Sequence, residues 1–162
     1  MQIVDSAPSQ TLHAVVLQAL RWMHFFFGVL WLGHLYFFNF VQAQYEKALT
    51  ADQKKALIPQ IRGRALWWFR WGAMITLLTG WGYLGYQEVI VRKSNFANWL
   101  SFGPDGAGAS NIWILFGGLL GTIMWFNVWF VIWPAQQVIL GALSGKREKP
   151  ADFDALVAMS HR

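Results

Sequence analysis

The chain has 162 residues, of which 56% are hydrophobic, 17% aromatic and only 13% charged. An ordinary soluble domain has roughly 25% charged residues. The mean hydropathy is +0.33, the formal net charge is +5 and there is no cysteine. This composition excludes a disordered chain, a disulfide scaffold, a thiolate metal site and covalent c-type haem attachment. In so apolar a chain, the basic excess is typical of the loops that orient a membrane protein. We therefore expect a lipid bilayer, and no nucleic acid, as partner.

Three segments are long and apolar enough to cross a bilayer, which takes roughly 20 helical residues. They are residues 20–41, 66–87 and 112–133. Helices are expected because a lone strand cannot satisfy its backbone hydrogen bonds in lipid. The sequence thus predicts an all-α integral membrane protein, with one membrane domain over residues 1–162 and three transmembrane helices.

The distribution of Lys and Arg predicts the orientation of these spans. The first loop, residues 46–64, and the tail, residues 146–162, together hold nine, whereas the opposite side holds three. Positive residues concentrate on the cytoplasmic side of membrane proteins. We therefore expect a cytoplasmic loop 46–64, an outer loop 88–110, a cytoplasmic tail 146–162 and an outside N-terminus.

Local signals predict how the first loop is built. Thr50 followed by Gln53 fits a capping box, in which each residue satisfies the other's free backbone N–H. A short helix should therefore begin here, and Pro59 should end it.

Small residues recur at four-residue intervals on two of the spans. Gly72, Thr76 and Gly80 form such a row on the second span, and Gly117 and Gly121 form a GxxxG pair on the third. Because lipid offers no hydrophobic drive for helix association, rows of this kind favour close helix packing.

Ionisable side chains inside a membrane cost roughly 2.5–3.5 kcal/mol each, so each needs an explanation. His24 and His34 lie in the first span, Arg70 in the second and Asn127 in the third, while Arg21 stands at the outer end of the first. With a rise of ~1.5 Å per residue, Arg21 and His24 form an outer polar layer. The other three form an inner polar layer.

Imidazole at membrane depth serves haem ligation, metal ligation or proton relay. No carboxylate lies within a span, and His24 and His34 are about 15 Å apart along one helix, too far to share an ion. A haem needs only one or two axial ligands and a cation for its propionates. Arg21 or Arg70 would supply that cation, and Phe27 and Trp31 would line the ring.

Other interpretations of these residues stay open. His24 could hydrogen-bond to water or headgroups at the interface, and His34 could hydrogen-bond to a neighbouring helix. Arg70 could extend its guanidinium to the cytoplasmic interface. Asn127 is of a type that often forms interhelical hydrogen bonds.

Three stretches carry a resemblance to a known family: RWMHFFFGVLWLGHLYFFNFVQ, RALWWFRWGAMITLLTGWGYLG and GGLLGTIMWFNVWFVIWPAQQVI, beginning at residues 21, 64 and 117. They resemble the membrane domain of bacterial cytochrome-c-linked urate oxidase, a family also called urate oxidase N-terminal or urate hydroxylase, and especially its short stand-alone members. The resemblance implies a multi-helix domain of the bacterial inner membrane that passes electrons to cytochrome c, with urate as donor in full-length forms. Arg21 and His24 match the family's Arg-Trp-x-His pattern.

The chain also departs from that family. Full-length members have more helices and a C-terminal cytochrome c domain, and short members continue into a further hydrophobic span. We therefore expect either a three-span protein or a fourth helix beyond residue 162.

Three functions follow from these observations. The leading hypothesis is a b-type haem protein of electron transfer, with His24 as the stronger axial-ligand candidate and His34 as a second ligand or the ligand of another haem. Such a protein would work as a subunit or an oligomer and feed a cytochrome c or an oxidase. The alternative is a cofactor-free accessory or assembly subunit of a respiratory or oxidative complex. The third is an enzyme that oxidises urate.

Overall fold

The computed structural model describes residues 7–93, 107–148 and 150–160, and every regular element within these ranges is helical. This confirms the prediction of an all-helical chain for the part that the structure describes. The chain forms two compact units. Unit 1 comprises residues 1–27 and 75–123, and unit 2 comprises residues 28–74 and 124–162.

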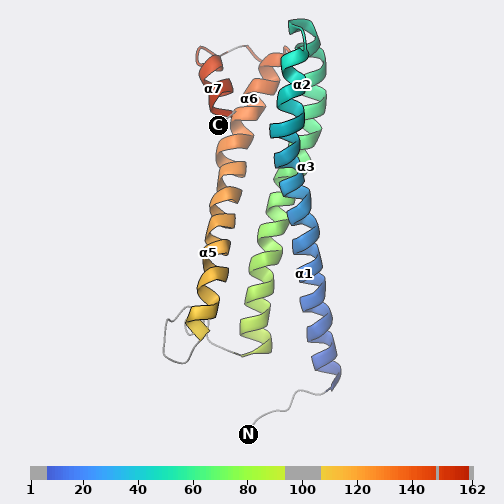
Figure 1. Cartoon of the computed structure of the whole chain (residues 1–162), viewed down its shortest axis with the longest axis vertical. Coiled ribbons are helices and arrows are strands. Elements are labelled where there is room, and N and C mark those ends of the chain that lie inside the picture. The colour runs from blue at the N-terminus through green and yellow to red at the C-terminus, as the bar shows by residue number, and fades with distance from the viewer. Residues whose placement is uncertain (1–6, 94–106, 149, 161–162) are drawn as a thin grey trace. The chain divides into compact units, whose positions relative to one another are not determined.

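The first long helix extends beyond the predicted span at both ends (Figure 1). It consists of α1 (Ala7–Tyr36), the π-helical segment η1 (Phe37–Gln42) and α2 (Ala43–Ala48). Pro8 lies in the first turn of this helix, where a backbone N–H would have no acceptor within the helix. Proline, which lacks that N–H, therefore removes no hydrogen bond there. The helix Pro8–Ala48 is long and apolar enough to cross a membrane. At ~1.5 Å per residue it measures about 60 Å, twice the thickness of a hydrocarbon core.

The second long helix consists of α3 (Ala51–Gly85) and the π-helical segment η2 (Tyr86–Val91). The predicted capping box is confirmed: the Thr50 N–H donates to Gln53 Oε1 at 2.9 Å, and the Gln53 N–H donates to Thr50 Oγ1 at 3.4 Å. The prediction that Pro59 ends the helix is wrong, because Pro59 lies inside α3. Proline removes only one hydrogen bond of a long helix. The neighbouring Ile58 is buried and helps to hold the helix in place.

The third long helix consists of α5 (Ala107–Phe126), the π-helical segment η3 (Asn127–Ile132) and α6 (Trp133–Leu143). Its part Ile112–Leu143 is the second segment long and apolar enough to cross a membrane. Pro134 cannot donate to the carbonyl of Phe130 and its ring crowds that carbonyl, which accounts for the widened turn before α6. The predicted tail contains a further helix, α7 (Phe153–Ser160), which the sequence analysis did not expect. Of the predicted outer loop 88–110, residues 94–106 lie outside the described ranges.

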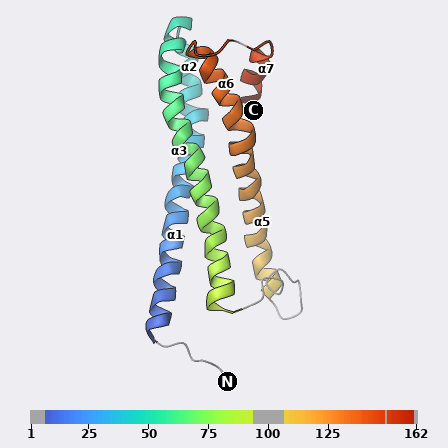
Figure 2. The same ribbon diagram turned by 180° about the vertical axis from the view of Figure 1, so that it is seen from behind.

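Unit 2 holds the hydrophobic core. Its buried members are Trp31 from α1, Leu66, Phe69 and Ala73 from α3, and Val128 from η3. The first part of α3 lies beside α6 in this unit (Figures 1 and 2). A Cβ on Gly72 would lie 3.5 Å from the Trp31 backbone nitrogen, so α1 and α3 approach closely at that point. This confirms the packing role predicted for the Gly72 row.

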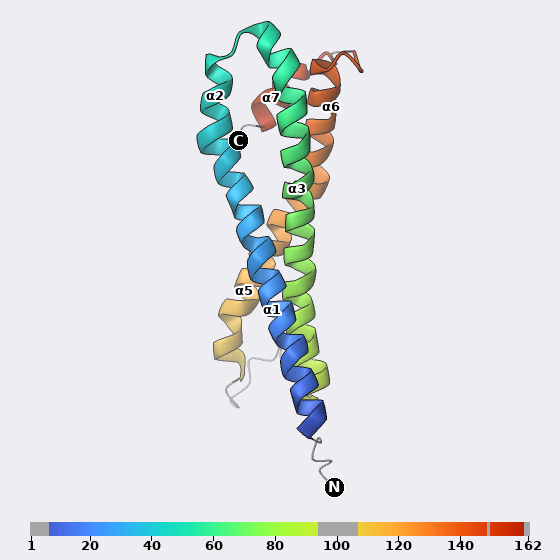
Figure 3. The same cartoon turned by 90° about the vertical axis from the view of Figure 1, so that its right-hand side faces the viewer.

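Unit 1 repeats this close approach with different residues. The first part of α1 lies beside the last part of α3 (Figure 3), and a Cβ on Gly80 would meet the His24 ring. Gly118 of α5 contacts the Trp81 ring, whose Nε1–H donates to Thr122 Oγ1 at 3.2 Å. Gly117 has nothing within 4 Å of an added Cβ, and neither does Gly121. The GxxxG pair therefore makes no close helix contact with the described part of the chain.

Large apolar side chains cover the outside of each unit. In unit 1, Phe25 and Phe26 are each 64% exposed, and in unit 2 Phe40 is 67% exposed. Large apolar patches exposed to water are rare on soluble monomers. The surface is consistent with contact to lipid.

Candidate functional site

His24 is held against α3 within unit 1. Its Nδ1 lies 2.8 Å from the backbone oxygen of Thr76. A carbonyl oxygen only accepts, so Nδ1 carries the proton and the lone pair of the neutral imidazole is on Nε2. An added Cβ on Gly80 would lie 2.8 Å from Cε1 but 3.9 Å from Nε2. The protonated edge of the ring therefore faces α3, and Nε2 lies farther from it.

Arg21 lies one helical turn before His24 and also binds α3. Its Nη2 donates to the Tyr83 hydroxyl at 2.7 Å, and its guanidinium carbon is 5.4 Å from the centroid of the same ring. This hydrogen bond uses one of the five N–H donors of the Arg21 guanidinium. The predicted outer pair of Arg21 and His24 therefore shares one face of the α1–α3 contact in unit 1, with Phe27 partly buried at the next turn of α1.

His34 belongs to unit 2 and has the same proton arrangement as His24. Its Nδ1 lies 2.7 Å from the backbone oxygen of Leu30, one turn earlier on the same helix. Nδ1 is again the protonated nitrogen, and Nε2 again keeps the lone pair. The side chain is partly buried and lies 6.2 Å from the Phe38 ring, centroid to centroid.

Arg70 lies among three tryptophan rings of unit 2. Its guanidinium carbon is 3.8 Å from the ring centroid of Trp133, 4.7 Å from that of Trp129 and 5.7 Å from that of Trp71. Each such cation–π contact contributes about 0.5–2 kcal/mol. Together they stabilise the guanidinium at this partly buried position. We call this arrangement the Arg70 cage.

Several N–H donors near the core of unit 2 have no hydrogen-bond acceptor. Within the described part of the chain, the buried Nε of Arg70 has no partner, and the same holds for the indole Nε1 atoms of Trp31, Trp125 and Trp129. An unpaired buried donor costs about 1–3 kcal/mol. Four of them in one unit create a strong demand for acceptor atoms.

The remaining predicted site residues lie apart from one another. Trp31 is only 6% exposed and packs into the core of unit 2. Asn127 is the first residue of η3 and its side chain is exposed. Arg21, His24 and Phe27 belong to unit 1, whereas Trp31, His34, Arg70 and Asn127 belong to unit 2. The described residues contain no group of three or more His, Asp or Glu that could hold a metal ion.

One polar cluster was missed by the sequence analysis. In unit 2, Arg62 Nη2 donates to Glu46 Oε1 at 2.7 Å, and Gln42 Nε2 donates to the same oxygen at 2.6 Å. The side chains of Arg62 and Glu46 are only 11% and 14% exposed. The four-residue spacing of Gln42 and Glu46 was a usable signal, since such residues are neighbours on a helix. The distant Arg62 had no signal of this kind.

No protein-family model, curated protein or solved structure matches this chain. The resemblance to the urate oxidase membrane domain therefore stays a prediction from the three sequence stretches.

Proposed function

We propose that this protein is a b-type haem protein that transfers electrons in a membrane. The observation that carries the proposal is the proton arrangement of His24 and His34. A histidine that ligates a metal usually donates its other ring N–H to a carbonyl or carboxylate, which fixes the ring and makes the ligating nitrogen more basic. Both histidines donate Nδ1–H to a backbone carbonyl and keep Nε2 for a ligand.

Each unit also holds N–H donors of the kind that a haem propionate needs. A propionate is an anion that needs N–H donors, and the free donors of Arg21 in unit 1 and the unpaired Nε of Arg70 in unit 2 are of this kind. The two histidines would ligate separate irons, because ten residues of helix place them about 15 Å apart. His24 is exposed on its own unit, so a second copy or another membrane subunit would complete its haem. When bound, haem supplies one-electron redox chemistry.

The proposal includes a membrane topology. Three spans with the N-terminus outside would place the cation-rich loop 46–64 and tail 146–162 in the cytoplasm. Two long apolar helices support a membrane location. The resemblance adds the bacterial inner membrane as the compartment and cytochrome c as an electron acceptor.

Haem content per chain tests the proposal directly. The protein is purified in mild detergent, and its reduced-minus-oxidised visible spectrum is compared for the parent, His24→Ala, His34→Ala and His13→Ala. His13 is the matched control, because it lies on the same helix and bonds the Tyr86 hydroxyl at 2.9 Å. We expect a b-type α-band in the parent and in His13→Ala, its loss or weakening in His24→Ala, and recovery on adding free imidazole. A colourless parent, or an equal loss in His13→Ala, would refute the proposal.

A cofactor-free accessory subunit is the second candidate, and one observation favours it. A Cβ added to Gly117 or Gly121 would have no neighbour within 4 Å in the part of the chain that the structure describes. Such GxxxG pairs serve close helix association. If the accessory function is correct, the protein comigrates with a larger membrane complex and carries no haem. Replacing both glycines by leucine should then release it from that complex.

Oxidation of urate, which the family resemblance implies, makes a separate prediction. Adding urate to the oxidised protein should reduce its haem under anaerobic conditions. An unchanged spectrum would dismiss this third function without affecting the first.

A further inference from the structure

Unit 2 contains a cavity of about 650 Å³ that the proposed electron transfer does not use. Its apolar wall includes Phe38, Leu66 and Phe69, and its polar rim includes Glu46 and Arg62. We call it the inner cavity, because its residues fall where the predicted first and second spans meet the cytoplasmic loop. In the proposed topology, that level is the boundary between acyl chains and headgroups.

The charge of the rim favours an anion. Glu46 accepts from both Arg62 and Gln42 and forms an ion pair with Arg62, so these two charges balance. Lys47 and Lys54 also line the inner cavity and leave its rim with an excess of positive charge. Basic pockets between helices on the cytoplasmic side are typical sites for anionic lipid headgroups.

One residue that lines the inner cavity has a buried acceptor without a partner among the described residues. Gln136 of α6 lines the cavity and is only 5% exposed. Its amide oxygen has no hydrogen-bond partner in the described part of the chain. Leaving it unpaired is costly, so the matching ligand carries a hydroxyl or N–H group close to its anion.

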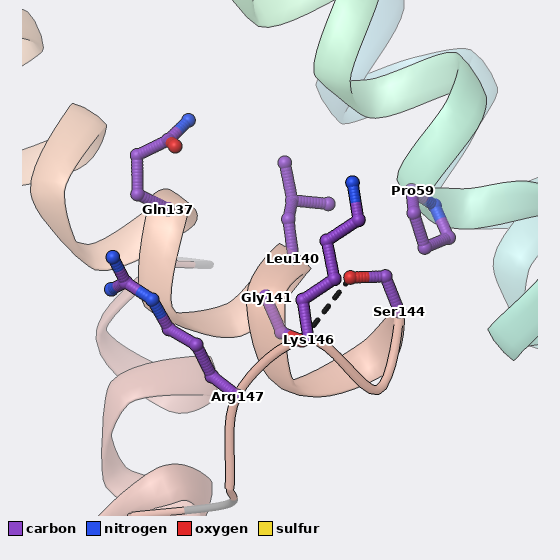
Figure 4. Close-up of a pocket in the computed structure, with 7 residues that line it drawn as sticks. All are labelled: Pro59, Gln137, Leu140, Gly141, Ser144, Lys146 and Arg147. Carbon is purple, nitrogen blue, oxygen red and sulfur yellow. Dashed lines mark hydrogen bonds between the residues drawn. The ribbon is translucent and has the colours of Figure 1, made fainter.

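A second hollow at α6 makes a useful contrast. It has about 360 Å³ and is lined by Lys146 and Arg147, with Pro59 of α3 across from them (Figure 4). The carbonyl of Gly141 there accepts from Ser144 Oγ at 3.1 Å and from two backbone N–H groups, so it is satisfied. This hollow offers positive charge without a buried unpaired acceptor.

We propose that the inner cavity binds an anionic phospholipid with a hydroxylated headgroup, of the phosphatidylglycerol class. Its acyl chains would lie along Phe38, Leu66 and Phe69, its phosphate would face Lys47 and Lys54, and a headgroup hydroxyl would donate to Gln136. The proposal rests on the proposed topology and is independent of haem.

Binding is measured by native mass spectrometry and by the shift in Tm with short-chain lipids added to the detergent-purified full chain. Dioctanoyl phosphatidylglycerol should bind about fivefold more tightly than dioctanoyl phosphatidylethanol, which has the same single negative charge but no headgroup hydroxyl. Dioctanoyl phosphatidylcholine and inorganic phosphate should bind weakly. Equal binding of phosphatidylcholine would refute the charge argument. Full competition by inorganic phosphate, or displacement of the lipid by urate, would replace the proposal with a site for a soluble anion.

Variants separate the contributions of the rim and of the buried acceptor. Lys54→Gln should weaken phosphatidylglycerol binding about fivefold, since a lysine near a membrane surface contributes about that much. Lys55→Gln is the matched control, because Lys55 is the next residue of α3 and does not line the inner cavity. Gln136→Leu should abolish the preference for phosphatidylglycerol over phosphatidylethanol while the protein stays folded, because leucine leaves no unpaired oxygen. An equal effect of Lys55→Gln, or a preference retained in Gln136→Leu, would overturn the proposal. A haem-free preparation that still binds the lipid would separate this site from the proposed function.

Discussion

The contact between Gly80 and His24 gives a prediction that tests the packing of unit 1. In Gly80→Ala, the new Cβ would lie 2.8 Å from His24 Cε1, closer than a Cβ approaches another atom, and a tight 3.0 Å from Nδ1. The imidazole must move, and its hydrogen bond to the Thr76 carbonyl is lost or distorted. The lost hydrogen bond costs about 0.5–1.5 kcal/mol. An off-rotamer ring costs about as much again.

A matched variant isolates this cost. Gly117→Ala makes the same exchange on α5, where nothing lies within 4 Å of the added Cβ. Both variants gain about the same helix propensity, so it cancels in the comparison. Gly80→Ala should therefore be about 1–3 kcal/mol less stable than Gly117→Ala. Gly72→Ala should behave nearly like Gly117→Ala, because its Cβ would meet Trp31 at an ordinary 3.5 Å.

The measurement is equilibrium unfolding in mixed detergent micelles, followed by the fluorescence of the 11 tryptophans. His24→Ala removes the ring that the new methyl group strikes. In the His24→Ala background, Gly80→Ala should cause no loss of stability. The coupling free energy between residues 24 and 80 would then be about 1–3 kcal/mol. Equal stability of Gly80→Ala and Gly117→Ala, or no coupling to His24, would refute the reasoning.

Three further predictions concern other parts of the chain. Arg70→Met should lower haem content and leave stability nearly unchanged, because the lost cation–π contacts are set against the removal of a buried unpaired donor; a parallel loss of stability would contradict this. Thr50→Ala should destabilise the start of α3 by about 1 kcal/mol, measured by urea unfolding, and no change would argue against the capping box. The chain has no cysteine, so single replacements report topology. Lys55→Cys and Lys146→Cys should react with a membrane-impermeant maleimide only after the cells are opened, whereas Lys93→Cys should react in intact cells. Labelling of all three from one side would contradict the three-span topology.

The amino-acid sequence alone determined the helical class of this protein and some of its local structure. Apolar residues over more than 20 positions predicted helices, because only a helix satisfies its own backbone hydrogen bonds without a partner. The capping box of Thr50 and Gln53 was equally predictable, since it involves contacts only three residues apart. The effect of Pro59 was misjudged because it depends on the whole of α3. A local pattern shows the one hydrogen bond that proline removes, but it does not show the stability of the rest of the helix.

Contacts between distant residues were decided only by the tertiary structure. The sequence predicted His24 and Arg70 at membrane depth but left their partners open. The Thr76 carbonyl that fixes the His24 proton is 52 residues away, and Trp129 and Trp133 reach Arg70 from another helix. The rotation of each helix about its axis selects such partners, and that rotation is set by how all the side chains pack together. Sequence spacing records only which residues share a helix face, so the Arg70 cage and the inner cavity became visible only in the folded chain.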